Sequence, residues 1–297
     1  MAQKELFQTT QEGQPGSDVV LFGSSSFSEP DWVGPFYPKG TQSRDFLSVY
    51  ASKLRTVEID ATYYAVPSLR TVESWRTRTP EGFLFSVKFP KQVVHGGDGP
   101  HPEGARILDS DIARATTDAF LENISALGEK LGVILIQFPY FNRSVFAESG
   151  PFFERMDRFL QTLPTDTHRF AVETRNKNWL IPGFFRILEQ NRCIPALVDQ
   201  GWMPHGDELA ELANPLMNGW GYVRLIGDRR EIEAITDRWD REVIDRGERL
   251  ARWAKLLVKH AGAAEKIVVY VNNHFAGHSP ATIRRLMELF EQEVQKT

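Results

Sequence analysis

Short apolar segments alternate with amphipathic segments along most of the chain. Eight runs rich in Val, Ile and Leu are predicted to be strands. Because most of these runs are continuous, they are typical of parallel strands that are covered on both faces. The runs span residues 19–22, 56–59, 83–88, 132–137, 169–173, 193–198, 221–226 and 266–271. Several segments between them carry apolar residues at every third or fourth position, which predicts amphipathic helices.

Two of these helices have clear start signals. Asp109 or Ser110 is expected to cap the helix whose apolar stripe includes Phe120. Ser279 is expected to cap the last helix, with Pro280 at its first position. Strand and helix alternate eight times in one chain, and this repetition predicts a (β/α)8 barrel of the TIM type.

A doubly wound open sheet is the alternative α/β fold. That fold usually carries a glycine-rich phosphate-binding turn after its first strand, whereas residues 22–27 contain a single glycine. We therefore expect residues 18–297 to form a single barrel domain. Residues 1–17 are polar and contain two glycines and a proline, so we expect them to be a flexible lead-in without a core.

Composition and charge narrow the function classes. The 35 basic and 39 acidic residues give a net charge of −4, which argues against a generally basic nucleic-acid binder. No apolar run approaches the roughly 20 residues of a membrane span, and residues 1–10 lack the apolar region of a signal peptide, so we expect a cytoplasmic protein without membrane contact. The single cysteine, Cys193, excludes an intramolecular disulfide and multi-cysteine zinc sites. We predict no metal and no cofactor, and the sequence does not determine the oligomeric state.

Polar residues stand at the ends of seven of the eight predicted strands. In a barrel these ends converge on one mouth, where active sites lie, and buried polar groups there need partners or a ligand. Acid–base or nucleophilic roles are predicted for Glu58, Lys88, His95 and Glu173. Ligand-binding roles are predicted for Trp32, Tyr63, Gln137, Arg175, Trp179, Asp199, Arg224, Asn272 and Asn273. The remaining histidines include His205, which we expect at the surface.

Several motifs around these strand ends resemble those of one family. They are Gly23–Phe27 with Trp32–Pro38, Thr56–Tyr64, Pro80–Pro90, Ile136–Pro139, Val172–Trp179, Tyr222–Leu225 and Val271–His274. In this order they are similar to the YecE-like family, domain of unknown function 72, over roughly residues 19–290. The resemblance implies a TIM-type barrel with a polar pocket at the carboxyl ends of its strands, and it implies no particular reaction.

The chain departs from the family pattern at three positions. Asp60 stands where the family usually has Asn, Tyr140 replaces a frequent second Pro, and Ile226 replaces a His that follows the arginine of the seventh strand. The last departure weakens any mechanism that needs an imidazole on that strand.

The favoured functional hypothesis is a metal-independent enzyme that acts on a small anionic or carbohydrate-like molecule. Lys88, Arg175 and Arg224 would hold a phosphate or carboxylate, and Glu58 and Glu173 would transfer protons. One alternative is a metal-dependent, nucleic-acid-processing barrel like endonuclease IV, although few histidines lie near the predicted mouth. Another is a non-catalytic binding protein whose charged residues form a closed structural layer. An open pocket favours the first hypothesis, and a fully paired layer favours the last.

Overall fold

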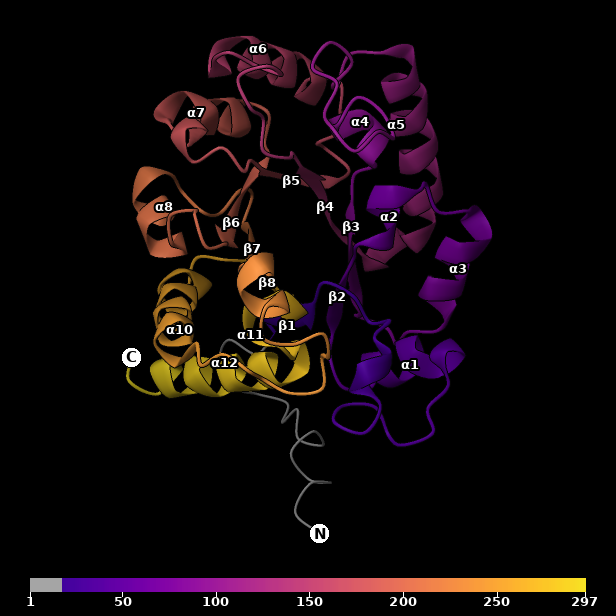
Figure 1. Ribbon diagram of the computed structural model, residues 1–297, viewed down its shortest axis with the longest axis vertical. Coiled ribbons are helices and arrows are strands. Elements are labelled where there is room, and N and C mark those ends of the chain that lie inside the picture. Colours follow the sequence, from indigo (N-terminus) through magenta and orange to yellow (C-terminus); the bar gives the residue numbers. More distant parts are fainter. Residues whose placement is uncertain (1–17) are drawn as a thin grey trace.

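The computed structural model describes residues 18–297, and it shows eight parallel strands that form a nearly closed barrel surrounded by helices (Figure 1). The hydrogen-bonded order of the strands is β1-β8-β7-β6-β5-β4-β3-β2. The strands are β1 Val20–Ser24, β2 Thr56–Ile59, β3 Leu84–Lys88, β4 Leu131–Gln137, β5 Arg169–Glu173, β6 Ile194–Asp199, β7 Trp220–Leu225 and β8 Lys266–Val271. The predicted (β/α)8 barrel is therefore confirmed, and the predicted lead-in 1–17 lies outside the described residues.

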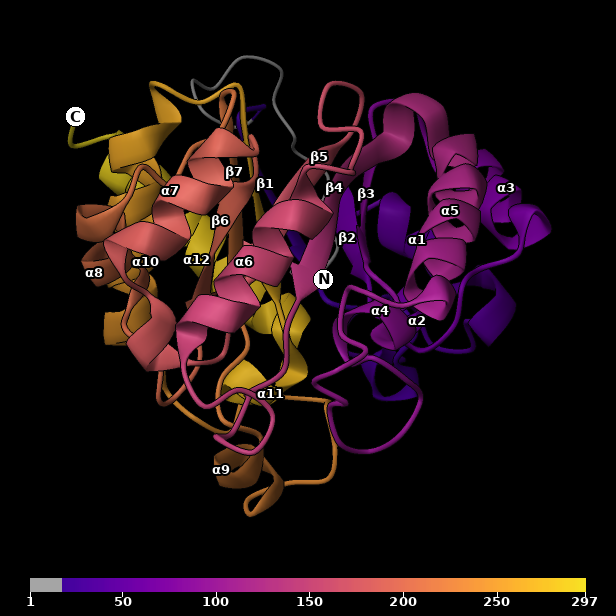
Figure 2. The ribbon, with the colours of Figure 1, turned by 90° about the horizontal axis from the view of Figure 1, so that it is seen from above.

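The helices form an outer ring, and several short helices lie together at one end of the barrel (Figure 2). The helices are α1 Phe46–Ala51, α2 Ala61–Tyr64, α3 Leu69–Thr77, α4 Lys91–Val94, α5 Asp111–Ile124, α6 Ser149–Leu160, α7 Pro182–Gln190, α8 Gly206–Leu212, α9 Arg229–Glu233, α10 Gly247–Ala261, α11 Asn273–Ala276 and α12 Ser279–Val294. The short helices α2, α4, α9 and α11 each follow a strand closely, so they surround the carboxyl ends of the strands.

The helix starts agree with the sequence in one case and differ in the other. Ser110 caps α5 by accepting a hydrogen bond from the backbone N–H of Ala113. The cap of α12 is His278 rather than Ser279, because the Nδ1 atom of His278 accepts from the backbone N–H of Ala281. Among residues 18–297, no helix has the length and apolar character needed to cross a membrane.

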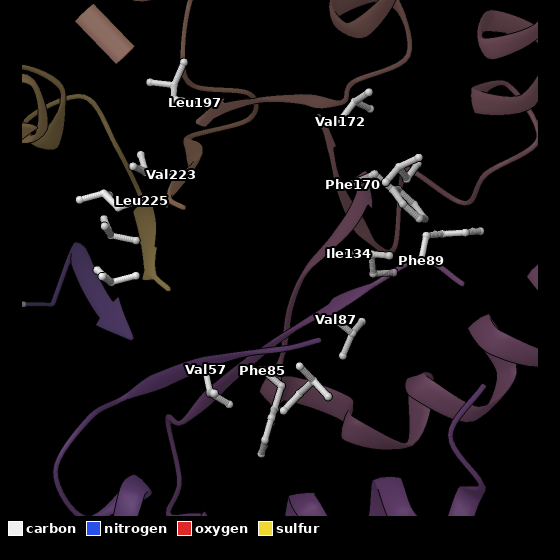
Figure 3. Packing of buried hydrophobic residues seen from close by; sticks show 14 of the residues in the cluster. Val57, Phe85, Val87, Phe89, Ile134, Phe170, Val172, Leu197, Val223 and Leu225 are labelled. Carbon is white, nitrogen blue, oxygen red and sulfur yellow. The ribbon is translucent and has the colours of Figure 1, made fainter. Parts of the chain in front are cut away.

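Alternation along the strands separates two apolar cores. One set of side chains fills the barrel interior, and it includes Leu135, Tyr222 and Tyr270. The side chains between them in sequence face the helices, and Figure 3 shows members of this outer core from β2 to β7. Because successive side chains of a strand point to opposite faces, the position of a residue decides which core it joins.

The barrel is completed at β1 and β2, the two ends of the hydrogen-bonded sheet. Gly23 lies so close to β2 that a Cβ atom there would be 2.1 Å from the carbonyl oxygen of Thr56. The Tyr50 hydroxyl bridges the two strands, since it accepts from the backbone N–H of Ser24 at 2.8 Å and donates to the Thr56 carbonyl at 3.0 Å. A buried side chain thus takes the place of a direct backbone ladder at this junction.

Candidate functional site

The polar residues at the strand ends continue the inward-facing rows of the barrel. Arg224 follows Trp220 and Tyr222 along β7, and Gln137 follows Val133 and Leu135 along β4. The same alternation directs three further side chains inward at the carboxyl end, which are Glu58, Lys88 and Glu173. Strand geometry therefore brings these charged and amide groups together above the apolar interior.

Arg224 is the centre of a buried ionic layer. Its Nε and Nη2 atoms donate to the two carboxylate oxygens of Glu58 at 2.9 and 2.8 Å. Its Nη1 atom donates to Glu173 and, at 3.1 Å, to the side-chain oxygen of Gln137. The Tyr222 hydroxyl donates a further hydrogen bond to Glu58. One guanidinium thus binds two carboxylates, one of them in a bidentate pair.

The charges of this layer are mutually stabilised. Burial raises the pKa of Glu173, but Arg224, Arg175 and Lys88 outweigh that effect and hold the pKa below its ordinary value. Burial lowers the pKa of Arg224, but Glu173 and Glu58 outweigh burial and raise it well above the ordinary value. Glu173 is therefore ionised at neutral pH. Because Glu58 and Glu173 bind Arg224 and do not line the cavity above it, this geometry does not support the predicted proton-transfer roles of the two glutamates.

A cavity of about 370 Å³ opens above the ionic layer. Its lining residues are Asp60, Tyr63, Tyr64, Lys88, His95, Gln137, Pro139, Tyr140, Arg175 and Trp202. The Nζ atom of Lys88 lies 2.6 Å from Asp60 Oδ1 and 3.9 Å from Glu58 Oε1. Lys88 therefore connects the buried layer to the cavity, and Asp60 is the carboxylate that faces the cavity.

Arg175 supplies a second positive charge to the cavity. Its Nε atom donates to Glu173 Oε1 at 3.2 Å, while its terminal nitrogens donate no hydrogen bond to any of residues 18–297. The side chain is about a quarter exposed (26%). Among the described lining residues, two cations therefore face one carboxylate.

His95 lies in the cavity wall, at the end of α4. Burial, with smaller contributions from Lys91 and Arg175, lowers the pKa of His95 to about 4, so its imidazole is uncharged at neutral pH. Its Nδ1 atom is buried and has no hydrogen-bond partner among the described residues. The ring of Tyr63 meets that of His95 edge to face, 6.3 Å between centroids, and burial raises the pKa of Tyr63 to about 12. Both groups are therefore neutral hydrogen-bonding groups in the wall.

Three aromatic side chains form the rim of the cavity, and the sequence analysis assigned none of them to the site. They are Tyr64, Tyr140 and Trp202, with 76%, 61% and 47% of their surfaces exposed. The rings come from the segments after β2, β4 and β6. A large aromatic residue shortly after a polar strand end was the available signal for these positions, as it was for Tyr63.

The predicted role of Asp199 as a ligand-binding residue is not supported. Asp199 is two residues after Leu197, which belongs to the outer core, so its side chain points away from the barrel interior. Its carboxylate accepts hydrogen bonds from Arg249 and from the indole N–H of Trp253, both on α10. His205, predicted at the surface, is also buried here and lies against the Trp253 ring, with centroids 4.8 Å apart.

Five other predicted ligand-binding residues lie outside the cavity lining. One is Arg224, whose guanidinium binds Glu58 and Glu173 in the buried layer instead of a ligand. Trp32 and Trp179 are buried in aromatic clusters under the loops, because their large apolar surfaces pack against other rings. Asn272 caps α11 by accepting from the backbone N–H of His274, and Asn273 accepts from the backbone N–H of Ser279. The local backbone therefore uses the side-chain oxygens of both asparagines.

The described residues contain no group of three or more His, Cys, Asp and Glu side chains arranged to hold a metal ion. Cys193 lies just before β6, at the opposite end of the barrel from the cavity, and burial raises the pKa of its thiol to about 12.

The fold and the cavity define a TIM-type barrel protein with a polar pocket at the carboxyl ends of its strands. The family model described as "Protein of unknown function DUF72" matches residues 21–297, so the chain belongs to this family. Relatives include the UPF0759 protein YunF of Bacillus subtilis, 24% identical over 93% of this chain and 96% of YunF. The UPF0759 protein YecE of Escherichia coli is 28% identical over 56% of this chain and 52% of YecE.

Solved structures show the same fold. A DUF72 family protein from Thermotoga maritima superimposes with a TM-score of 0.66 and 25% identity, over 92% of this chain and 99% of that protein. A DUF72 family protein from Enterococcus faecalis gives a TM-score of 0.65 with 22% identity, over 92% of this chain and 95% of that protein.

Proposed function

We propose that the cavity is the active site of an enzyme whose small substrate carries a phosphate or carboxylate group, bound between Lys88 and Arg175. The observation that carries this proposal is the presence of two cationic side chains among the described lining residues, beside one carboxylate and an uncharged His95. Ammonium and guanidinium groups are the usual partners of phosphate and carboxylate groups, so these two side chains favour an anionic ligand.

The buried layer fixes the direction of the ligand-binding groups. The side-chain oxygen of Gln137 accepts from Arg224, which has only donors, so the amide NH2 is the group left for a ligand. Glu58 and Glu173 hold Arg224 in place and thereby support Gln137 and Arg175 from below. In this proposal the two glutamates and Arg224 are positioning residues.

Asp60 and His95 are the proposed acid–base groups. Asp60 lies beside Lys88, and its side chain is 34% exposed, so it can contact a ligand directly. An anion bound next to His95 favours the imidazolium form and therefore raises the pKa of His95 toward neutrality. Substrate binding would in this way convert an inert imidazole into a proton acceptor at physiological pH.

The binding of inorganic phosphate, measured by isothermal titration calorimetry, tests this proposal. Lys88→Met and Arg175→Met should each weaken binding by about tenfold to a hundredfold, because each removes a charge-assisted hydrogen bond worth about 1.5–3 kcal/mol. Arg186→Met is the matched control, since Arg186 is exposed on α7 and is not among the residues that line the cavity. Equal phosphate affinity in the wild type and both cavity variants would contradict the proposal.

A further inference from the structure

The exposed aromatic residues in the part of the chain that the structure describes are confined to one place. Among residues 18–297, the exposed large aromatic side chains are Tyr64, Tyr140 and Trp202, and all three line the cavity. The exposed large aliphatic side chains, such as Ile112 and Ile235, do not line it. Scattered exposed apolar residues need no explanation, but three aromatic rings gathered at the mouth of one charged cavity suggest a common ligand.

The three rings are contributed by separate parts of the barrel. Tyr64 ends α2, Tyr140 follows β4, and Trp202 follows β6. Tyr64 is supported by an edge-to-face contact with Tyr63, 5.3 Å between centroids. Segments that are far apart in sequence therefore present aromatic surface to the same space, while the charged groups lie deeper.

Trp202 links the aromatic rim to the proposed anion site. Its indole N–H points to the backbone carbonyl of Arg175 at a distance of 3.4 Å. This contact uses the polar edge of the indole, and Trp202 as a whole remains 47% exposed beside the residue that would hold the anion. A ligand held by Arg175 would thus extend along the Trp202 ring.

We infer that the ligand is a phosphate or carboxylate whose anionic group is joined to a ring, and that this ring stacks on Tyr64, Tyr140 and Trp202. The inference rests on the proposed function and specifies the substrate class of the same site. Aromatic side chains stack on nucleobases and pack against other flat ring faces, so a nucleotide and a sugar phosphate share the required chemistry. The polar wall formed by Asp60, His95 and Gln137 lies between the two ends and suits hydroxyl groups.

The affinities of three probes for the wild type test the inference. Adenosine 5′-monophosphate, glucose 6-phosphate and inorganic phosphate are compared by calorimetry at the same pH and salt concentration. At least one ring-bearing probe should bind about tenfold or more tightly than inorganic phosphate. A preference for adenosine 5′-monophosphate would identify base stacking, and a preference for glucose 6-phosphate would identify a sugar ring.

Variants of the rim separate ring stacking from anion binding. Trp202→Leu and Tyr140→Leu should weaken the preferred ring-bearing probe by about tenfold and leave the affinity for inorganic phosphate unchanged. Ile112→Ala removes exposed apolar surface on α5 and should change neither affinity.

Two results would overturn the inference, and they are distinguishable. If inorganic phosphate binds through Lys88 and Arg175 but neither ring-bearing probe binds more tightly, the inference of a ring-bearing ligand is wrong and the proposed anion site stands. If none of the three probes binds, the proposed function fails, and the inference fails with it.

Discussion

Arg224 holds the buried ionic layer beneath the cavity together, because its guanidinium is the shared partner of Glu58 and Glu173. Arg224→Met leaves two buried carboxylates without their main counter-charge. We expect this variant to lose about 3–5 kcal/mol of unfolding free energy, as is typical when one member of a buried ion pair is removed. Equilibrium denaturation by urea measures the loss, and Arg186→Met should change stability by less than about 0.5 kcal/mol.

The same layer makes the free energy of unfolding depend on pH in the acidic range. The pKa of Glu173 is lower in the folded protein than its ordinary value, so the carboxylate contributes stability above its unfolded pKa, and this contribution is lost as the pH falls through the folded pKa. Arg224→Met should therefore flatten the acid side of the stability profile. A variant as stable as the wild type at neutral pH would show that the layer is not a structural unit.

His95, unlike Glu173, becomes positively charged when it takes up a proton. Its effect on the free energy of unfolding appears at a higher pH than that of Glu173. Its pKa of about 4 in the folded protein lies below the ordinary 6.5, so the unfolded chain takes up a proton first as the pH falls. The wild type should lose stability relative to His95→Asn between about pH 6.5 and pH 4, and the difference should be constant above that window. Denaturation at several pH values measures it, and a pH-independent difference would contradict the burial of a neutral imidazole.

Some residues of the candidate site could be predicted from the sequence. The polar ends of the strands correctly indicated Lys88, Gln137 and Arg175 as neighbours of one cavity. Alternation along β6 places Asp199 on the outward face with Leu197, but the continuous apolar run of this strand does not show in the sequence which face points outward. The pairing of both glutamates with Arg224 depends on distances across the barrel, which the sequence does not specify.

The elements of the fold were predictable where they are long and apolar. All eight strands were expected close to their observed positions, because buried parallel strands leave a strong continuous pattern. The four-residue helices α2, α4 and α11 were not predicted, since a single turn has no periodicity to detect. These same short elements place Tyr64, which was not predicted, and they use the side-chain oxygen of Asn272 as a helix cap.

The junction between β1 and β2 depends on one hydroxyl group. Tyr50→Phe removes the bridge between the Ser24 N–H and the Thr56 carbonyl and leaves two buried backbone groups unsatisfied. We expect a loss of about 1–3 kcal/mol and faster amide hydrogen exchange at Ser24. Tyr140→Phe is the matched control, because the Tyr140 hydroxyl belongs to an exposed side chain. Unchanged exchange at Ser24 would show that the bridge does not stabilise the junction.

The whole molecule brings two cationic side chains, Lys88 and Arg175, to one cavity although its net charge is −4. The strands direct charged side chains to the carboxyl end, the two buried glutamates bind Arg224, and Lys88 and Arg175 line the cavity. The buried ionic layer beneath the cavity is thus already organised before a ligand binds.

The most direct test of this account is a crystal structure determined in the presence of saturating phosphate. We expect a phosphate within hydrogen-bonding distance of Lys88 Nζ and the guanidinium of Arg175, with Arg224 still bound to both glutamates. A cavity that holds only water under these conditions, or a phosphate bound elsewhere with none between Lys88 and Arg175, would show that these two residues do not form an anion site.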